Sequence, residues 1–343
     1  MDKHKQANNK VNVAVIGLGR MGKIHLRNLV QSIQNAKLVM VADAIYPAEE
    51  FKKEYPDLHL TKDAVEAISS NEVDAVVIST PTSSHAALVE QCISYHKHVF
   101  CEKPLDLSLA VTKELLQKAE ASGVSLMIGF NRRFDPDFMQ ARKSVSEGKI
   151  GNPQIIKITN RDPSLPLIEF VKTSGGMFMD FTIHDFDMVR YMMGKEVTEV
   201  YAKGLVFFDK AIADAGDVDT ALTTLTFEDG TYAVLDNSRK AVYGYDQRME
   251  IFGDKGMIQV ENNLNNRNIL YNEEGIHHAL PLNSFTERYM QSYRKEMELF
   301  IDSLINNTPV PIKNEDVIMA TAIAYAAKKS MDEQRPVKLS EEL

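Results

Sequence analysis

The sequence contains few cysteines, no long apolar run and no cluster of basic residues. Its two cysteines, Cys92 and Cys101, offer neither a disulfide framework nor the spacing of a zinc site, so we expect two buried thiols. No stretch is long and apolar enough to cross a membrane. Residues 1–10 lack the apolar segment of a signal peptide, which predicts a frayed tail and a cytoplasmic protein. A net charge of −9 without a basic stripe argues against a nucleic-acid partner.

The length and the hydrophobic pattern predict two domains. A chain of 343 residues exceeds the size at which single cores stop growing. From residue 11 to residue 130, short apolar strands alternate with helices, which predicts a parallel sheet covered on both faces. From residue 131 to residue 343 the strands are longer, and several alternate apolar with polar residues. This second pattern predicts an open, mostly antiparallel sheet with one main helix over 177–193 and two final helices, the last of which can pack on either domain.

A glycine-rich loop follows the first predicted strand. Gly17, Gly19 and Gly22 have the G-x-G-x-x-G spacing between a strand and a helix. The first glycine permits a tight turn, the second lets the backbone approach a pyrophosphate, and the third lets the helix pack close to the strand. The helix N-terminus offers N–H groups and partial positive charge to the phosphates. The loop therefore predicts a dinucleotide site.

The end of the second predicted strand indicates which dinucleotide binds. Asp43 stands there, about 20 residues after the loop. A carboxylate at this position accepts hydrogen bonds from the adenosine ribose hydroxyls and repels a 2′-phosphate. No arginine or lysine follows directly, which favours NAD over NADP. The alternative is an acid that merely starts the next helix.

Two later strand ends carry further polar residues. Thr80, Pro81 and His85 follow one strand, and Glu102 and Lys103 follow the next. Open α/β sheets bind ligands outside the carboxyl ends of their strands. The proline after Lys103 favours an extended geometry there, so we expect this lysine to point at the nicotinamide end of the cofactor. The alternative is a solvated surface lysine, the commoner fate of that residue type.

The predicted helix over 177–193 carries an acid and a histidine. Asp180 and His184 are four residues apart, which puts their side chains on one helical face, with Asp187 nearby. Histidine is suited to take a hydroxyl proton. The alternative is a core histidine with an aspartate partner, since the segment is strongly apolar. A metal site from these three side chains has no second histidine nearby, so we expect no metal.

Taken together, these motifs resemble the glucose–fructose oxidoreductase and inositol dehydrogenase family. The residues that carry the resemblance are the glycine loop, Thr80-Pro81, Glu102-Lys103-Pro104, Gly129-Phe130-Asn131-Arg132-Arg133-Phe134, and Gly175-Gly176 followed by Asp180 and His184. It extends from about residue 11 to residue 335. Members of the family have a Rossmann domain followed by a mostly antiparallel sheet domain, and many are tetramers. The resemblance therefore implies an NAD-binding domain over 11–130, a substrate-binding and oligomerisation domain over 131–343, and a homotetramer paired through the second-domain sheets.

The resemblance also implies roles for the polar residues. His184 becomes the base, Asp180 fixes its tautomer, and Lys103 stabilises negative charge on the reacting oxygen. The cofactor, NAD, accepts a hydride at nicotinamide C4. The expected cofactor contacts are Gly17, Gly19, Arg20, Met21, Gly22, Asp43, Thr80, Pro81, His85, Glu102 and Lys103.

Within the family, residues 237–248 and, less closely, residues 160–163 resemble inositol 2-dehydrogenases. Arg132, Asn160, Asp162 and Tyr243 are the candidate polyol contacts, with a surface ion pair for the arginine and sheet packing for the tyrosine as alternatives. Some myo-inositol enzymes have a histidine where this chain has Asn160, so the isomer stays open. We expect oxidation of a ring hydroxyl of myo- or scyllo-inositol to the 2-keto sugar. The alternatives are a dehydrogenase of another sugar and a non-catalytic, cofactor-sensing protein.

Overall fold

The computed structural model describes residues 10–343, so the predicted tail over residues 1–9 lies outside it. The chain forms two compact units. The first runs up to Asn131 and includes Gln291–Ile318, and the second comprises Arg132–Met290 and Met319–Leu343. Residues 291–318 thus group with the first unit, whereas the sequence pattern places them in the second. In the described range, no helix is long and apolar enough to cross a membrane.

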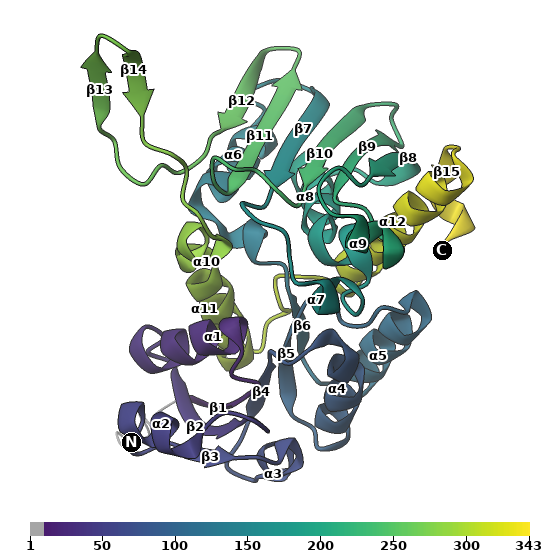
Figure 1. Ribbon diagram of the computed structural model, residues 1–343. Helices are drawn as coiled ribbons and strands as arrows, with labels where there is room; N and C mark the ends of the chain where they lie inside the picture. The colour runs from purple at the N-terminus through teal and green to yellow at the C-terminus, as the bar shows by residue number, and fades with distance from the viewer. Residues whose placement is uncertain (1–9) are drawn as a thin grey trace, which may run out of the picture. The chain divides into compact units, whose positions relative to one another are not determined.

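The first unit is built on a six-stranded parallel sheet (Figure 1). Its strands are β1 (Val11–Ile16), β2 (Ala36–Ala42), β3 (His59–Thr61), β4 (Ala75–Ile78), β5 (His98–Glu102) and β6 (Leu126–Gly129). Their order is β3-β2-β1-β4-β5-β6, and every neighbouring pair is parallel. The residues of β4 are all buried, as expected for a β-branched strand covered on both faces. The predicted parallel sheet is confirmed.

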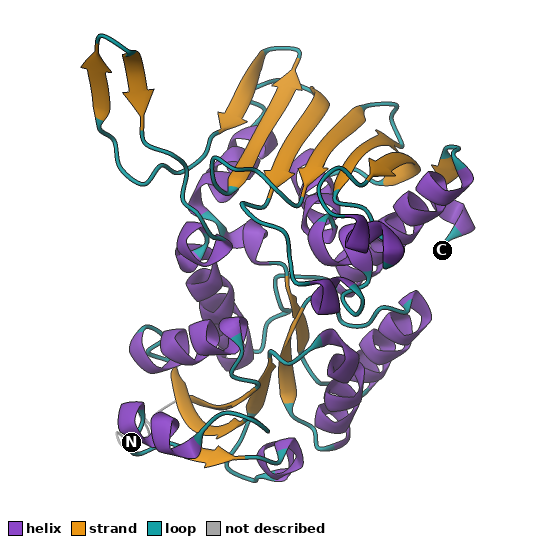
Figure 2. Cartoon of the chain, in the orientation of Figure 1, coloured by secondary structure: helices purple, strands orange, loops and turns teal. Residues whose placement is uncertain are grey.

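Helices surround the strands of this first sheet (Figure 2). They are α1 (Arg20–Gln31), α2 (Ala48–Glu54), α3 (Ala64–Ser69), α4 (His85–Ser94), α5 (Leu109–Ala121) and most of α11 (Met290–Asn306), with a short 3-10 turn at Thr82–Ser84. A further 3-10 turn, Asn131–Phe134, begins at the last residue of this unit and continues into the second. α1 packs on β1 and β2, α4 on β4 and β5, and α5 on β6. The strand order reverses direction between β1 and β4, and this is the point where doubly wound folds bind nucleotides.

The second unit is built on a seven-stranded sheet. Its strands are β7 (Pro153–Arg161), β8 (Val197–Leu205), β9 (Thr220–Phe227), β10 (Tyr232–Ser238), β11 (Asp246–Gly253), β12 (Gly256–Val260) and β15 (Val337–Lys338), in the order β12-β11-β7-β10-β9-β8-β15. Only the β7–β10 pair is parallel, with Asn160 opposite Asn237. The prediction of a mostly antiparallel sheet is confirmed.

One face of this second sheet is covered and the other is exposed. Along β9, Thr223 and Leu225 are buried while Leu222 is exposed, which is the period-two alternation of a half-buried strand. α6 (Pro136–Ser146) and α8 (Ile183–Met193) pack on β12 and β7 respectively. A hairpin of β13 (Ile269–Asn272) and β14 (Gly275–His278) stands apart from the sheet, and all its strand residues are exposed (Figure 1).

The helix predicted over 177–193 is not one α-helix. It is a π-helical turn at Met177–Phe181, followed after Thr182 by α8. Gly176, with φ of 79°, precedes the turn, and the Met177 N–H donates to Asp217 Oδ1 at 2.8 Å. The remaining elements of this unit are α7 (Ile168–Val171), α9 (Lys210–Asp214), α10 (Phe285–Arg288), the part of α12 (Asn314–Glu333) from Met319 onward, and a 3-10 turn at Leu339–Glu341.

Candidate active site

The glycine loop joins β1 to α1 in a conformation that side chains would prevent. Gly17 has φ of 93°, and a Cβ there would lie 2.8 Å from the Ser79 carbonyl oxygen. A Cβ on Gly22 would lie 1.8 Å from the Gly17 carbonyl oxygen, whereas one on Gly19 would meet no atom of the described residues within 4 Å. α1 starts with no capping side chain and no acid in its first turn, as far as the described chain shows. A helix start of this kind suits an anion such as a pyrophosphate.

Asp43 is fixed against this loop by its own hydrogen bonds. Its Oδ2 accepts from the Leu18 N–H at 2.6 Å, and its Oδ1 accepts from the Ile45 and Tyr46 N–H groups at 2.9 and 2.8 Å. The carboxylate is half-buried at the end of β2. The glycines, the open helix start and this carboxylate together fit a dinucleotide with a free ribose 2′-hydroxyl.

His85 joins the two polar strand ends of the first unit. It is buried, its Nε2 is 2.8 Å from the Thr80 carbonyl oxygen, and its Nδ1 is 2.9 Å from the Pro104 carbonyl oxygen. The Lys103–Pro104 peptide bond is cis, and Lys103 is half-buried. The His85 ring thus links the two polar strand ends that the sequence pattern singles out in this unit.

The other predicted cofactor contacts lie around the same strand ends. Arg20 and Met21 form the first turn of α1, and Pro81 is exposed just after β4. Glu102 ends β5, and its Oε1 lies 2.7 Å from His25 Nε2. That bond turns the Glu102 side chain into the buried interior of the unit, with 9% of the residue exposed.

In the second unit, Asp180 and His184 lie on two different helical elements. Asp180 belongs to the π-helical turn and His184 to α8, and both are half-buried. Asp180 Oδ2 lies 3.4 Å from NH1 of Arg239, an arginine that is only 1% exposed. A π turn inside a helix is frequent at functional sites, because it changes the direction of the side chains that follow. Arg239 is a partner of Asp180 that the spacing of Asp180 and His184 did not reveal.

Next to His184 in the chain, Asp185 is the centre of a buried network. Its Oδ1 accepts from Arg132 NH1 at 2.5 Å, and its Oδ2 accepts from Asn160 Nδ2 at 2.9 Å and Asn237 Nδ2 at 2.7 Å. Burial raises the pKa of this carboxyl, and the arginine and the two amides oppose that rise. Two predicted polyol contacts, Arg132 and Asn160, therefore lie in a buried network rather than on the surface.

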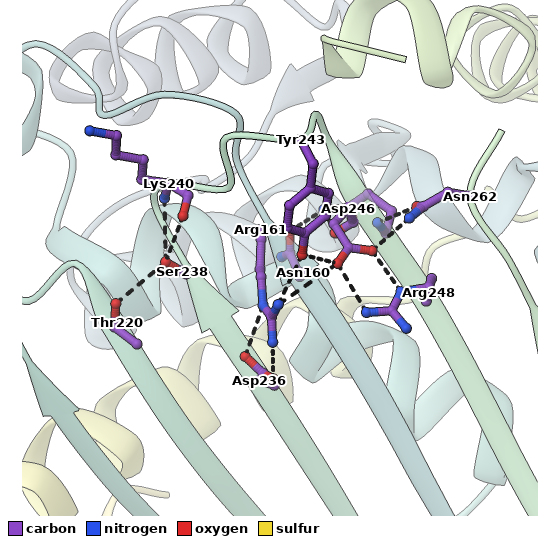
Figure 3. A network of polar contacts seen from close by, with 11 residues as sticks. Asn160, Arg161, Thr220, Asp236, Ser238, Lys240, Tyr243, Asp246, Arg248 and Asn262 are labelled. Carbon is purple, nitrogen blue, oxygen red and sulfur yellow. Dashed lines mark hydrogen bonds and ion pairs between the residues drawn. The ribbon is translucent and has the colours of Figure 1, made fainter. Parts of the chain in front are cut away.

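A second polar network lies at the end of the sheet strands in this unit (Figure 3). Tyr243 donates to Asp246 Oδ2 at 2.7 Å and accepts from Arg161 NH1 at 2.9 Å. Arg161 also pairs with Asp236, and Asp246 accepts from Asn262 at 2.6 Å. Burial, and then the hydrogen bond to Asp246, raise the pKa of the Tyr243 hydroxyl. The network leaves Tyr243 37% exposed, so its ring reaches the surface.

Two further sequence predictions meet a different environment. Asp187, expected near the face of Asp180 and His184, is buried and pairs with Arg133 through two bonds of 2.8 and 2.5 Å. Asp162 follows β7 and is half-buried, and its backbone bonds to the Ser238 carbonyl and the Ala241 N–H. Asp187 is therefore held in a buried ion pair on α8.

Comparison with known proteins places these observations in a family. The family described as "Oxidoreductase family, NAD-binding Rossmann fold" matches residues 11–130, and the GFO/IDH/MocA C-terminal domain matches residues 138–259. A myo-inositol 2-dehydrogenase of Thermotoga maritima is 45% identical over 330 residues, which are 96% of this chain and 98% of that protein. An inositol 2-dehydrogenase of Rhizobium meliloti is 40% identical over 332 residues, 96% of this chain and 99% of that protein.

A solved structure extends the similarity to the fold. The crystal structure of a scyllo-inositol dehydrogenase from Lactobacillus casei, with bound cofactor NAD(H) and scyllo-inositol, matches with a TM-score of 0.90 at 32% identity. The match covers 96% of this chain and 99% of that one. The fold and the glycine-loop site define an NAD-binding oxidoreductase with a Rossmann domain. The chain belongs to the GFO/IDH/MocA family, as the sequence motifs predict, and the NAD prediction is confirmed.

Proposed function

We propose that this protein oxidises a ring hydroxyl of myo- or scyllo-inositol to 2-keto-myo-inositol, with NAD as the acceptor. The observation that carries the proposal is the 45% identity, over nearly the whole chain, to a protein named myo-inositol 2-dehydrogenase. The chain also contains a lysine, an aspartate and a histidine suited to this chemistry, at Lys103, Asp180 and His184. Alcohol oxidation needs a base for the hydroxyl proton and a cation or hydrogen-bond donor for the oxygen.

In this proposal, His184 takes the hydroxyl proton. Asp180 holds the histidine in its productive orientation, and Arg239, buried behind it, fixes the Asp180 carboxylate. Lys103 donates a hydrogen bond to the reacting oxygen as negative charge develops there. NAD, when bound, accepts the hydride from the substrate carbon.

The four predicted polyol contacts divide into two roles. We infer that Asp162 and Tyr243 contact the substrate directly, since both side chains reach solvent. Arg132 and Asn160 hold Asp185, the residue after His184, and so support the position of the base from within the core. A ring polyol offers many hydroxyls, and acidic and phenolic side chains suit their recognition.

We also propose that the protein is a homotetramer paired through the second-unit sheets. The uncovered face of the sheet carries large apolar side chains on adjacent strands, since strand register puts Leu222, Tyr232, Phe252 and Met257 on that side. Exposed apolar patches of this kind commonly mark interfaces. The mass in solution, measured by light scattering, tests this, and a monomer would contradict it.

The substrate is tested by initial rates of NADH formation with myo-inositol, scyllo-inositol and glucose. We expect kcat/KM to be highest with one of the two inositols. A higher value with glucose would move the function to another sugar. Tight NAD binding without turnover of any of the three would favour a cofactor-sensing protein instead.

The catalytic roles are tested by Lys103→Ala and His184→Ala. We expect each to lower kcat by roughly 10²- to 10⁴-fold, the usual contribution of a general base or of a donor to a developing oxyanion. The Kd for NAD should change little. Lys52→Ala and His278→Ala are matched controls, because both residues are exposed on secondary structure elsewhere in the chain. Turnover close to wild type in both catalytic variants would contradict the assignment.

A further inference from the structure

Three ionisable side chains meet in the interior of the first unit, away from the glycine loop itself. They are His25 of α1, Glu102 of β5 and Glu296 of α11. Each offers a nitrogen or oxygen atom, and these atoms lie within 4.8 Å of one another. His25 and Glu296 are fully buried. Sequence spacing did not single out either of these two residues.

The surroundings of the cluster are apolar and closely packed. The His25 ring lies 5.1 Å from the Phe100 ring and 6.3 Å from the Tyr293 ring, both edge-on. Glu102 Oε2 lies so close to β6 that a Cβ on Gly129 would be 3.2 Å from it. Because bulk water does not solvate these side chains, an unpaired charge on one of them is energetically costly.

Hydrogen bonding within the cluster is unequal. His25 Nε2 and Glu102 Oε1 form a pair at 2.7 Å. Both Glu296 carboxyl oxygens are buried, and among the described residues neither has a hydrogen-bond partner. An ionised carboxylate in such a position would add a second negative charge beside Glu102 and leave the new charge unsolvated, which is strongly unfavourable. Burial, and then the charge of Glu102, raise the pKa of Glu296 well above its usual value.

We propose that Glu296 is a positioning residue, which stands as a neutral carboxylic acid beside the His25–Glu102 pair and keeps that pair in place. The pair joins the helix that follows the glycine loop to the strand end that carries Lys103. An ionised Glu296 would repel Glu102 and weaken this connection. The kinetic part of the proposal rests on the proposed role of Lys103, whereas the protonation of Glu296 does not.

The protonation has a consequence for stability with a definite sign. A glutamate in the unfolded chain loses its proton near pH 4.3. In the folded protein Glu296 keeps its proton to a higher pH, so between the two pKa values the folded state binds one proton more. Stability from this group is therefore lost as pH rises through that window, by up to about tenfold in the folding equilibrium constant per pH unit. The other titratable groups around it are His25, Glu102 and, one turn earlier on α11, Tyr293.

Glu296→Gln provides the first test, because glutamine has the shape of the neutral acid and does not titrate. Urea unfolding between pH 5 and pH 8 should show the variant gaining stability relative to wild type as pH rises. Infrared spectra at pH 8 should show a carbonyl band of a neutral carboxylic acid in wild type that is absent in the variant. Glu298→Gln is the matched control, since Glu298 is on the same helix, is partly exposed and pairs with Lys295. A wild-type spectrum without the band, and equal pH profiles, would overturn the proposal whether or not the protein oxidises inositol.

Kinetics test the positioning role. Glu296→Ala should lower kcat at least tenfold while leaving KM for the polyol within about twofold, and Glu296→Gln should restore most of the loss. An alanine variant that folds and keeps wild-type kcat would overturn the role. Because imidazole and carboxylates also bind divalent cations, wild-type protein is dialysed against Zn²⁺ or Mn²⁺ and its metal content measured. One equivalent of either ion retained by wild type and lost in Glu296→Gln would overturn the neutral-acid state.

Discussion

The region around the glycine loop in the first unit and the polar networks of the second unit are built by different means. Around the glycine loop most contacts involve the backbone, with glycines that make room, a helix start without a capping side chain among the described residues, and carbonyls that hold His85. Around α8 the contacts join side chains, and Asp185 with Arg132 is typical of them. A backbone-built site depends on residue spacing, whereas a side-chain network depends on packing between distant segments. The two should therefore fail differently when they are mutated.

The largest effect is expected at Asp185. Asp185→Ala removes the acceptor shared by the buried donors of Arg132, Asn160 and Asn237. The free energy of unfolding should fall by roughly 3–5 kcal/mol, as for other disrupted buried ion pairs. Urea unfolding measures the loss.

Asp332→Ala is the control for that loss, because its pair with Lys328 on α12 is exposed and is expected to matter by about 1 kcal/mol or less. A loss at Asp185 no greater than that of the control would show that the buried network adds little stability. The contrast between the two regions would then be wrong.

In the glycine loop, substitutions of two glycines distinguish an effect on stability from an effect on NAD binding. Gly22→Ala puts a methyl group against the Gly17 carbonyl, so we expect a stability loss of about 1–3 kcal/mol and at least tenfold weaker NAD binding. Gly19→Ala places its methyl group in open space, so stability should stay unchanged while NAD binding weakens. Urea unfolding and calorimetric titration with NAD measure both. Wild-type affinity in Gly19→Ala would mean that the pyrophosphate does not approach this residue.

The smallest effect is expected at Asp43. Asp43→Asn removes the negative charge and leaves one oxygen, which can accept either from the Leu18 N–H or from the Ile45 and Tyr46 N–H groups. Hydrogen bonds to a neutral acceptor are weaker by about 1 kcal/mol, so KM for NAD should rise by roughly fivefold and the preference for NAD over NADP should narrow. Initial rates with both cofactors give this ratio. An unchanged ratio would place the selectivity elsewhere than at this carboxylate.

Much of the fold was predictable because local patterns carry it. The glycine spacing marks the β1–α1 turn, and strands such as β9 show the alternation that the sequence pattern predicts for the second unit. The π-helical turn was not predictable, because the Asp217 side chain that bonds to its first N–H lies on a later segment. An apolar run over 177–193 looks the same whether or not it contains an extra residue in one turn.

The part of the site that depends on residue spacing was predictable, whereas the part that depends on packing between distant segments was not. Gly17, Gly19 and Asp43 follow from a known geometry of nucleotide binding. Arg239 and Glu296 come close to their neighbours only in the folded chain. Nothing in the sequence marks them, because an arginine or a glutamate is common in polar and helical segments. Arg132 was expected to contact the polyol, and its buried bond to Asp185 was not predictable, because the residues next to Arg132 in the chain do not indicate that partner.

The single parallel pair in the second sheet has a consequence for the order of folding. β8 and β9 lie between β7 and β10 in the chain, so the pairing of β7 with β10 closes a long loop. Pairings between such distant segments form late, because the chain must close a long loop before any contact rewards it. Asn160 and Asn237 meet only through that pairing, so the shell around Asp185 is completed near the end of folding. The residues that support the proposed base would then be assembled last, after the antiparallel hairpin of β9 and β10 is already in place.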